Sequence, residues 1–219
     1  INGYTVADLR VSRPAGSNDI LLAFVGTTDS ILLNDNAISY IGTNIEYVTF
    51  EDGTVLTMAD VKQLLVAQAA TAGNDTIEGT DAAETIAGGL GDDYLIGHEG
   101  HDTYVFNAGD GDDTIYDDGP EFGSADRILI NGYTFADIRV SRPSAGSNDL
   151  LITFAGSTDS ILVKNNMQSY IGTDIETVAF GDGSVYTMSQ IKQLLVDQGG
   201  TDGDDTIEGT NAAEIITGG

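Results

Sequence analysis

A nine-residue pattern repeats along the middle of this 219-residue chain, from Ala70 to Tyr116, and restricts its fold more than any other feature. An acidic residue stands at the sixth position of each unit and a large apolar residue at the eighth. The sixth positions are Asp75, Glu84, Asp93, Asp102 and Asp113, and the eighth positions are Ile77, Ile86, Leu95, Tyr104 and Ile115. Nine residues accommodate one tight turn and one short strand. Two units therefore make a full coil, and we expect each turn to stack on the second turn after it.

Glycine stands two residues before four of the five acids, at Gly73, Gly91, Gly100 and Gly111, whereas Ala82 takes this place in the second unit. Glycine permits a tight turn with positive φ, which brings backbone carbonyl groups close together. The acid adds an anionic oxygen beside those carbonyls. A site of six to eight oxygens with loose geometry suits calcium better than magnesium. The pattern therefore predicts bound Ca²⁺, with the sixth-position acids as ligands.

The pattern resembles the haemolysin-type calcium-binding (RTX) repeat, G-G-x-G-x-D-x-U-x, in which U is a large apolar residue. GGLGDDYLI, from Gly88 to Ile96, fits every fixed position. The unit from Gly79 to Ala87 departs most, with Ala82 in place of glycine and Glu84 in place of aspartate. A flexible glycine and aspartate linker is the competing interpretation, but such linkers lack a regular apolar residue. The resemblance implies a parallel β-roll filled with calcium.

Four further acids near the end of the block are candidate calcium ligands: Asp110, Asp112, Asp117 and Asp126. Asp110 and Asp112 stand beside the last sixth-position acid. Asp117 and Asp126 flank the loop that follows the block. Two interpretations stay open for this last pair: they complete the last calcium site, or they are solvated charges beside a turn.

A longer internal repeat, with a period of about 130 residues, organises the rest of the chain. INGYTVADLRVSRP at Ile1–Pro14 returns as INGYTFADIRVSRP at Ile130–Pro143, and after one inserted residue, Ser144, the two copies align to the end. The second nine-residue block brings two more predicted ligands, Asp205 and Glu214. We expect four segments: strand-rich domains at 1–69 and 118–199, an RTX block at 70–117, and the start of a second block at 200–219.

Each strand-rich domain is expected to consist of short strands and one closing helix. In the second copy, alternating apolar residues and turn signals predict these strands: Arg127–Ile130, Asp137–Ser141, Leu150–Phe154, Ser160–Val163, Ile175–Phe180 and Ser184–Tyr186. Thr187 and Gln190 predict a capping box, and Ile191, Leu194 and Leu195 predict an apolar helix face. This part resembles the domain that often accompanies RTX repeats. The predicted fold is mainly β, a parallel β-roll solenoid alternating with small strand-rich domains, each closed by a short helix.

The formal net charge of −27 limits the partners of this chain, since 35 acidic residues stand against 8 lysines and arginines. Nucleic acids and anionic membrane surfaces both require basic patches, so neither is an expected partner. No apolar run has the length of a membrane span, and we expect no membrane insertion. Hydrophobic residues make up 41% of the chain, too many for a disordered acidic tail. The acids are therefore expected to fold around metal ions.

The chain offers little for catalysis, and we expect no enzyme activity. Its two histidines, His98 and His101, lie in the sequence HEGH, whose spacing of three differs from the spacing of four on a zinc-hydrolase helix. No Gly-x-Ser-x-Gly sequence accompanies them. Calcium ligation accounts for the adjacent acid pairs. The arginines that recur in both copies are expected to pair with nearby acids, and an electropositive binding site is the alternative. They are Arg10, Arg13, Arg139 and Arg142.

The resemblance implies export through a type I secretion channel, with folding on calcium outside the cell. We interpret the chain as a structural segment of a secreted bacterial repeat protein, namely an adhesin, a surface-layer protein or an extracellular filament or matrix protein. The alternative is the calcium-binding export module of a secreted enzyme or toxin. The tandem arrangement favours the structural interpretation. Because the pattern at Ile1 begins partway through a unit, we expect further copies in the array, stacked head to tail.

Overall fold

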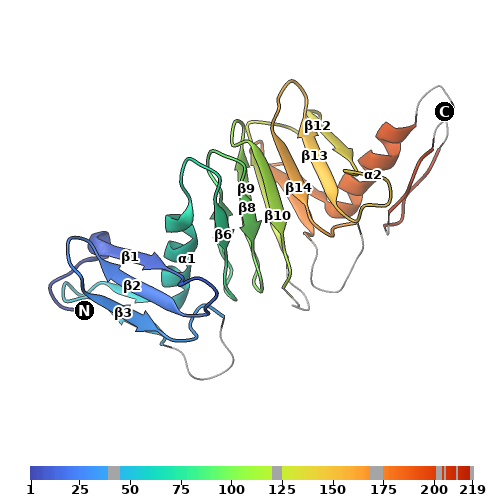
Figure 1. The fold of residues 1–219 in the computed structure, drawn as a ribbon. Coiled ribbons are helices and arrows are strands. Elements are labelled where there is room, and N and C mark those ends of the chain that lie inside the picture. Colours follow the sequence, from blue (N-terminus) through green and yellow to red (C-terminus); the bar gives the residue numbers. More distant parts are fainter. Residues whose placement is uncertain are drawn as a thin grey trace.

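The computed structural model describes residues 1–38, 45–119, 125–167, 175–200, 204, 206–210 and 212–217. The described chain is mainly β, with two α-helices. Figure 1 shows the first strand-rich copy, the strands of the nine-residue block and the second strand-rich copy following one another along the molecule. Neither described helix is long and apolar enough to cross a lipid bilayer.

The first copy forms a small antiparallel unit with its own core. Its elements are the 3₁₀-helix η1 (Val6–Asp8), strands β1 (Leu9–Ser12), β2 (Ile20–Phe24), β3 (Ser30–Leu33), β4 (Tyr47–Thr49) and β5 (Val55–Thr57), and helix α1 (Met58–Ala69). Strands β1, β2 and β3 form one sheet, and β4 pairs with β5. Leu9, Ile20 and Leu22 pack with Val61 and Leu65 of α1, because alternate strand residues face the helix.

Both helices begin with the predicted kind of cap. The Thr187 side chain accepts a hydrogen bond from the backbone N–H of Gln190, whose side chain accepts from the N–H of Thr187, at the start of α2 (Met188–Gly199). Thr57 and Asp60 make the same reciprocal pair at α1. The capping box predicted at residue 187 is therefore confirmed. These bonds satisfy backbone donors that the first helical turn leaves free.

The nine-residue block contributes strands to two parallel sheets. Strands β6 (Thr76–Glu78), β8 (Tyr94–Ile96) and β10 (Asp112–Tyr116) lie in one sheet, and β7 (Thr85–Ala87), β9 (Thr103–Asn107) and β11 (Arg127–Asn131) lie in the other. Ile77 pairs with Leu95, and Leu95 pairs with Ile115. Ile86 likewise pairs with Tyr104. This is the register expected when each turn stacks on the second turn after it.

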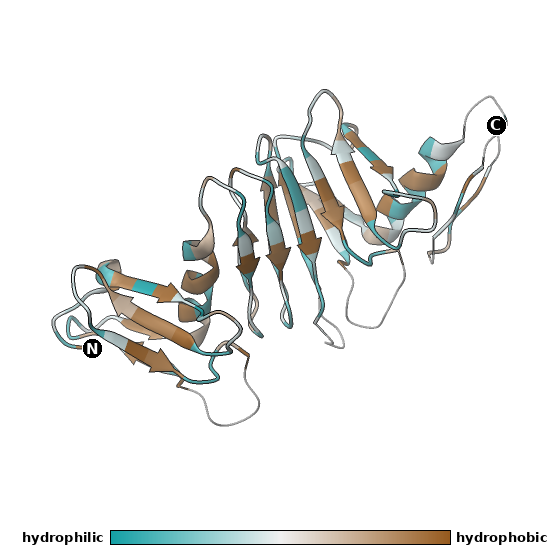
Figure 2. Ribbon diagram, in the orientation of Figure 1, coloured by the Kyte–Doolittle hydropathy of each residue, from teal (hydrophilic) through white to brown (hydrophobic). Residues whose placement is uncertain are grey.

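The second copy adds its strands directly to these two sheets. Its strands are β12 (Ile138–Ser141), β13 (Leu150–Phe154), β14 (Ser160–Val163), β15 (Thr177–Phe180) and β16 (Val185–Thr187), close to the predicted limits. Strand β14 pairs in parallel with β10, and β15 pairs in parallel with β11. Both sheets therefore continue across the predicted segment limit at residue 118, over a shared core (Figure 2).

The surface that carries Ile31 and Ile45 in the first copy, and Ile161 and Ile175 in the second, is exposed in one copy and buried in the other. Ile161 of β14 is 0% exposed, whereas the matching Ile31 of β3 is 41% exposed. Ile175 is 1% exposed, whereas the matching Ile45 is 42% exposed. In the second copy β10 and β11 cover this face, because they pair with β14 and β15. The exposed apolar residues of the first copy thus mark a surface that its homologous domain buries.

Candidate metal centre

Backbone amides tie the sixth-position acids of successive coils to one another. The N–H of Asp75 donates to Oδ1 of Asp93 over 2.8 Å, and the N–H of Asp93 donates to Oδ1 of Asp113 over 3.0 Å. We name Asp75, Asp93 and Asp113 the first acid ladder. Each acid stands immediately before or at the start of its strand, so the strand register places the acids one above another.

A second acid ladder follows the other sheet and consists of Glu84, Asp102, Asp126 and Glu176. The N–H of Glu84 donates to Oδ1 of Asp102 over 2.8 Å, and the N–H of Asp102 donates to Oδ1 of Asp126 over 2.7 Å. The N–H of Asp126 donates to Oε2 of Glu176 over 2.6 Å. The ladder therefore extends into the second strand-rich copy. Glu176 was not predicted as a ligand from the sequence, although its position before Thr177 repeats the acid–threonine pair found at the start of β6, β7 and β9.

Three of these acids keep one carboxylate oxygen buried without a hydrogen-bond partner. The oxygens are Oδ2 of Asp93, Asp102 and Asp113, and the three residues are at most 2% exposed. Buried polar atoms are nearly always hydrogen-bonded, and an unpaired buried carboxylate is especially costly. A hard cation that takes anionic oxygens would supply the missing partner. The residues present therefore fit Ca²⁺.

The electrostatics of the ladders agree with a missing positive charge. Burial, together with the neighbouring carboxylates of Glu84 and Asp126, raises the pKa of Asp102 to about 9. Burial likewise raises the pKa of Asp113 to about 7, with Asp93 as a neighbouring negative charge. A carboxyl group has a raised pKa where its ionised form lacks compensation. A bound cation would reverse this effect and keep both carboxylates ionised.

Glycines bring the stacked turns close enough for backbone oxygens to lie near the acids. Gly91 has a φ of +125°, and a Cβ atom there would lie 2.7 Å from the carbonyl carbon of Gly73. Gly100 has a φ of +139°, and a Cβ atom there would lie 2.3 Å from the carbonyl oxygen of Ala82. Side chains at these positions would force the turns apart. The glycine spacing therefore serves the close stacking that a shared ion requires.

Threonines already hold the predicted ligands at the beginning of each block. Oδ2 of Asp75 accepts from the N–H and the hydroxyl of Thr71, over 2.7 and 2.8 Å. The carboxylate of Glu84 accepts from the N–H of Thr80, over 3.0 Å, and from its hydroxyl. Glu214 is bound in the same way by Thr210. These acids thus differ from Asp93, because a threonine four residues earlier in the chain donates two hydrogen bonds to each of their carboxylates.

The remaining predicted ligands differ in their burial and in their hydrogen-bond partners. Asp110 is buried and accepts from the backbone N–H of Asn107 over 2.7 Å. Asp112 is exposed on the outer side of β10 and accepts from the Ser160 hydroxyl over 2.7 Å, so it does not join the other acids. Asp117 and Asp126 are buried, at 3% and 2% exposure, so they are not solvated charges. Asp205 lies outside the described residues.

The histidines make structural contacts in turns. His98 lies 2.8 Å from Asp118 through Nδ1 and 3.1 Å from Glu78 through Nε2. His101 Nδ1 accepts from the backbone N–H of Ala125 over 2.9 Å. Both histidines lie outside any helix, as their sequence spacing predicts.

Two of the four recurring arginines pair with acids as expected. Arg13 Nη1 lies 2.6 Å from Glu78 Oε1, and Arg142 Nε lies 3.9 Å from Glu208. Their Nη2 groups donate to the carbonyl oxygens of Gly79 and Gly209, over 2.5 and 2.6 Å. Each arginine therefore joins a strand-rich domain to the block that follows it.

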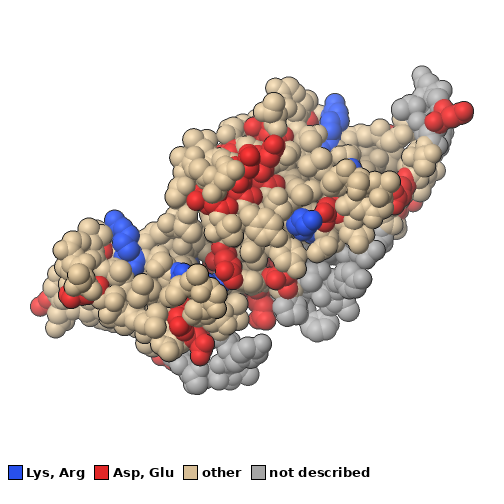
Figure 3. Space-filling model, viewed as in Figure 1, with Lys and Arg blue, Asp and Glu red and all other residues tan. Residues whose placement is uncertain are grey.

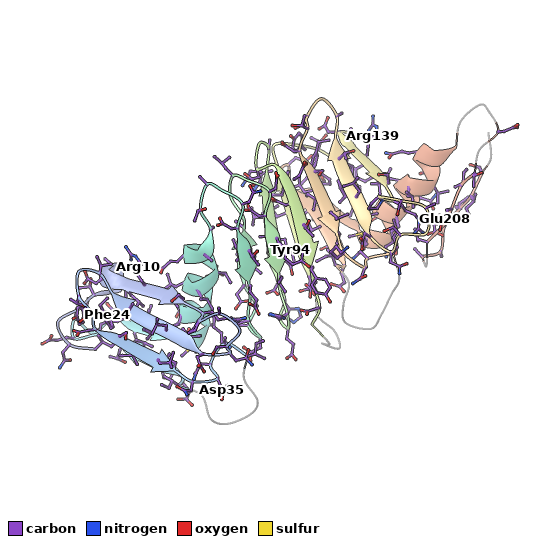
Figure 4. All side chains as sticks on the ribbon, viewed as in Figure 1. Arg10, Phe24, Asp35, Tyr94, Arg139 and Glu208 are labelled. Atoms are coloured by element: carbon purple, nitrogen blue, oxygen red, sulfur yellow. The ribbon has the colours of Figure 1, made fainter. Side chains whose placement is uncertain are left out.

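The other two arginines form no close ion pair among the described residues, although their charges help to lower the pKa of Asp8 and of Asp137. Arg10 and Arg139 donate to backbone carbonyl oxygens of Leu9 and Ile138, over 2.9 and 2.8 Å. They lie at equivalent places on β1 and β12 (Figure 4). Figure 3 shows how few basic side chains accompany the acidic ones on this face of the molecule.

Family comparisons agree with this geometry. The model of the RTX calcium-binding nonapeptide repeat (4 copies) matches residues 70–104, and the repeats of this family bind calcium. The model of the haemolysin-type calcium binding protein related domain matches residues 19–60 and again residues 149–190. No curated protein matches the chain. The chain therefore contains RTX calcium-binding repeats between two copies of the related domain, and these matches support an RTX calcium-binding repeat protein.

Proposed function

We propose that this chain is a calcium-stabilised structural segment of a secreted bacterial repeat protein, such as an adhesin, a surface-layer protein or an extracellular filament or matrix protein. RTX repeats are typical of secreted bacterial proteins, and the strand-rich segments match a domain related to haemolysin-type calcium-binding proteins. In this proposal, parallel β-roll blocks at 70–117 and 200–219 alternate with strand-rich domains at 1–69 and 118–199. The segment carries no catalytic role of its own.

The observation that carries the proposal is the contrast between the two strand-rich copies. Ile161 and Ile175 are buried where β14 and β15 pair with β10 and β11, whereas Ile31 and Ile45 are exposed. A face with exposed strand edges and apolar residues is suited to pairing with further strands. The end of another RTX block fits this face, because such a block already covers it in the second copy. An array of alternating segments, stacked head to tail, follows from this arrangement.

In this proposal, calcium stabilises the folded state of the chain. The acid ladders place buried carboxylates above one another, and in water their mutual repulsion opposes stacking. Calcium binds the stacked turns and has no equally ordered site in the unfolded chain, so its binding free energy contributes to folding. The chain would then be unfolded at low calcium, as export through a secretion channel requires, and folded outside the cell.

Calcium-dependent folding tests the proposal most directly. Circular dichroism and thermal melting of the purified chain are compared in excess chelator, in calcium and in magnesium. We expect β-structure and a raised melting temperature in calcium, and much less of both in chelator or magnesium. The same signal and melting temperature in all three conditions would exclude a calcium-stabilised segment.

Association of the chain is a separate test of the array. Light scattering with and without millimolar calcium measures whether the exposed face of the first copy binds another molecule. A heterologous contact that does not close should give growing assemblies with calcium. A strictly monomeric chain at high concentration in calcium would contradict association through this face.

A further inference from the structure

A buried lysine of α1 contacts an aspartate in a turn near the beginning of the RTX block. Lys62 Nζ and Asp81 Oδ1 form an ion pair, and the two side chains are only 6% and 14% exposed. Taking two charges out of water is costly, so a buried ion pair adds little net stability. The contact joins the first strand-rich copy to the block, because Lys62 belongs to α1 and Asp81 lies between β6 and β7.

Hydrogen bonds on both sides hold this pair in place. Gln63, next to Lys62, accepts from the backbone N–H of Thr85 over 2.8 Å and donates to its carbonyl oxygen over 2.9 Å. The N–H of Asp81 donates to the carbonyl oxygen of Ala37 over 3.3 Å. The amino group and the carboxyl group are therefore held against each other, and such an arrangement accelerates a reaction between two groups.

A second carboxyl group, that of Glu84, belongs to the same buried region. Glu84 is 2% exposed, and its carboxylate accepts hydrogen bonds from the N–H and the hydroxyl of Thr80. Burial raises the pKa of Glu84, while the charge of Lys62 lowers it and the charge of Asp81 adds to the rise. The charges of the pair therefore reach Glu84, and a carboxyl group in this position can assist proton transfer.

The second copy keeps the buried lysine but changes its sequence partner. Lys192 aligns with Lys62 and is likewise 5% exposed, whereas the residue aligned with Asp81 is Asn211. The hydrogen bonds around the first pair recur in the second copy, between Gln193 and Ile215 and between Thr210 and Glu214. Asparagine carries no charge for an ion pair. Aspartate and asparagine share a side-chain carbonyl carbon, which a lysine amine can attack.

We propose that Lys62 and Asp81 form an intramolecular isopeptide bond, an amide between their side chains. Nζ of Lys62 attacks Cγ of Asp81, the new C–N bond replaces one C–O bond, and the released oxygen leaves as water. Two of the three hydrogens of the ammonium group leave with that oxygen, so the reaction needs no other reactant. These protons move within the pair, and Glu84 is the neighbouring group that can assist the transfer.

The bond changes both the charge and the connectivity of the chain. It replaces two buried charges with one neutral amide, which surroundings of low polarity favour. It also closes a loop between residues 19 apart in the sequence, so the unfolded chain loses conformational freedom. The reaction is a single self-modification, and it goes beyond the proposed calcium-stabilised function because it ties α1 to the RTX block covalently.

Mass spectrometry of the denatured full chain, after folding in calcium, tests this bond. The wild-type chain should lack one water molecule that the Lys62→Arg variant keeps, because arginine retains the positive charge but has no amine to acylate. A protease digest of the wild-type chain should contain a branched peptide that joins residue 62 to residue 81. The Asp81→Asn variant should form the same branched peptide, with loss of ammonia in place of water.

A second lysine–aspartate pair in the chain is the matched control. Nζ of Lys164 lies 2.6 Å from Oδ2 of Asp149, but the lysine side chain is 34% exposed, so water solvates its charge. This pair should give separate peptides in the same digest. Branched peptides from both pairs would show that contact alone is sufficient, and would overturn the special role of the buried site.

The wild-type chain decides the question without either variant. Circular dichroism first shows that the chain is folded in calcium, and its mass is then measured over several days. A folded chain that keeps the full mass of its sequence at residues 62 and 81, and gives separate peptides there, would overturn the isopeptide bond. That result would leave calcium-dependent folding intact, because the ion pair alone also joins α1 to the block.

Discussion

The backbone N–H of Asp93 donates to Oδ1 of Asp113 over 3.0 Å, while Oδ2 of the same Asp113 is buried without a hydrogen-bond partner. One bond therefore fixes the orientation of the carboxylate, and the other oxygen is left for an ion. The relation recurs between Asp75 and Asp93 and between Glu84 and Asp102. Each coil thus orients the ligand of the coil that follows it.

The first prediction compares Asp93 with Glu84. Asp93→Asn should weaken calcium binding by about tenfold or more, or about 1.4 kcal/mol, because it removes charge from a carboxylate whose Oδ2 has no protein partner. Glu84→Gln should have a smaller effect, because Thr80 already binds the Glu84 carboxylate. Calcium titrations of both variants, followed by circular dichroism, measure the difference. Equal losses in the two variants would contradict the unequal roles of these acids.

The second prediction concerns pH in calcium-free protein. Burial raises the pKa of Asp113 and Asp117 to about 7 and that of Asp102 to about 9, far above the usual value of about 4 for aspartate. Between the usual pKa of aspartate and the raised pKa of each of these groups, the folded state binds more protons than the unfolded state. The free energy of unfolding therefore falls as pH rises through this range. Calcium-depleted chain should therefore contain more folded β-structure at pH 5 than at pH 8, as measured by circular dichroism.

In calcium the direction of this effect is opposite, because calcium binds the ionised carboxylates and acid competes with it. Calorimetry in two buffers of different ionisation enthalpy should detect protons released on calcium binding at pH 7. A calcium-free chain that is equally stable at both pH values would show that the ladder acids do not remain buried without calcium.

The third prediction concerns the contact between the first strand-rich copy and the RTX block. The Arg13 side chain is 8% exposed, pairs with Glu78 and donates to Gly79, so Arg13→Met should reduce the free energy of unfolding in calcium by about 1–3 kcal/mol. Arg10→Met is the matched control, because Arg10 is exposed and donates only to nearby carbonyl groups. Urea unfolding in saturating calcium measures both. A similar small effect of the two variants would contradict a structural role for the Arg13 contacts.

The fourth prediction compares two equivalent isoleucines. Ile161→Ala should destabilise the folded chain by about 2–5 kcal/mol, because Ile161 is fully buried in the shared core. Ile31→Ala should cost less than about 1 kcal/mol, because the matching side chain is 41% exposed. Thermal melting in calcium tests both variants. If Ile31→Ala proved as costly as Ile161→Ala, the exposed face of the first copy would already be covered in solution.

Local sequence patterns predicted much of this structure. The spacing of Ile77, Leu95 and Ile115 predicted the strand register, because a period of nine residues leaves one way to stack the turns. Thr187 with Gln190 predicted the helix start, because a capping box depends only on residues three apart. Features that depend on neighbours in sequence were therefore available without the structure.

Features that depend on distant contacts were not predictable. The strand-rich copies have nearly the same sequence, yet β14 joins β10 whereas β3 pairs only with β2 among the described strands. The sequence of a strand does not determine which other strand will pair with its free edge. Asp112 was predicted as a ligand but is exposed, because alternate strand residues face opposite sides and Asp113 faces inward. The local pattern of acids could not separate these two neighbours.

The acids that are joined by ladder hydrogen bonds lie at different separations along the sequence. These separations affect the order in which the parts of the fold can form. Asp75 and Asp93 are separated by 18 residues, Asp93 and Asp113 by 20, and Asp102 and Asp126 by 24, whereas Asp126 and Glu176 are separated by 50. Contacts of short range form rapidly, because little loop entropy is lost in closing them. Closing the longest of these loops costs about 1 kcal/mol more than closing the shortest. We therefore expect the block to grow coil by coil on a first nucleus, and docking of the second copy to be its slowest step.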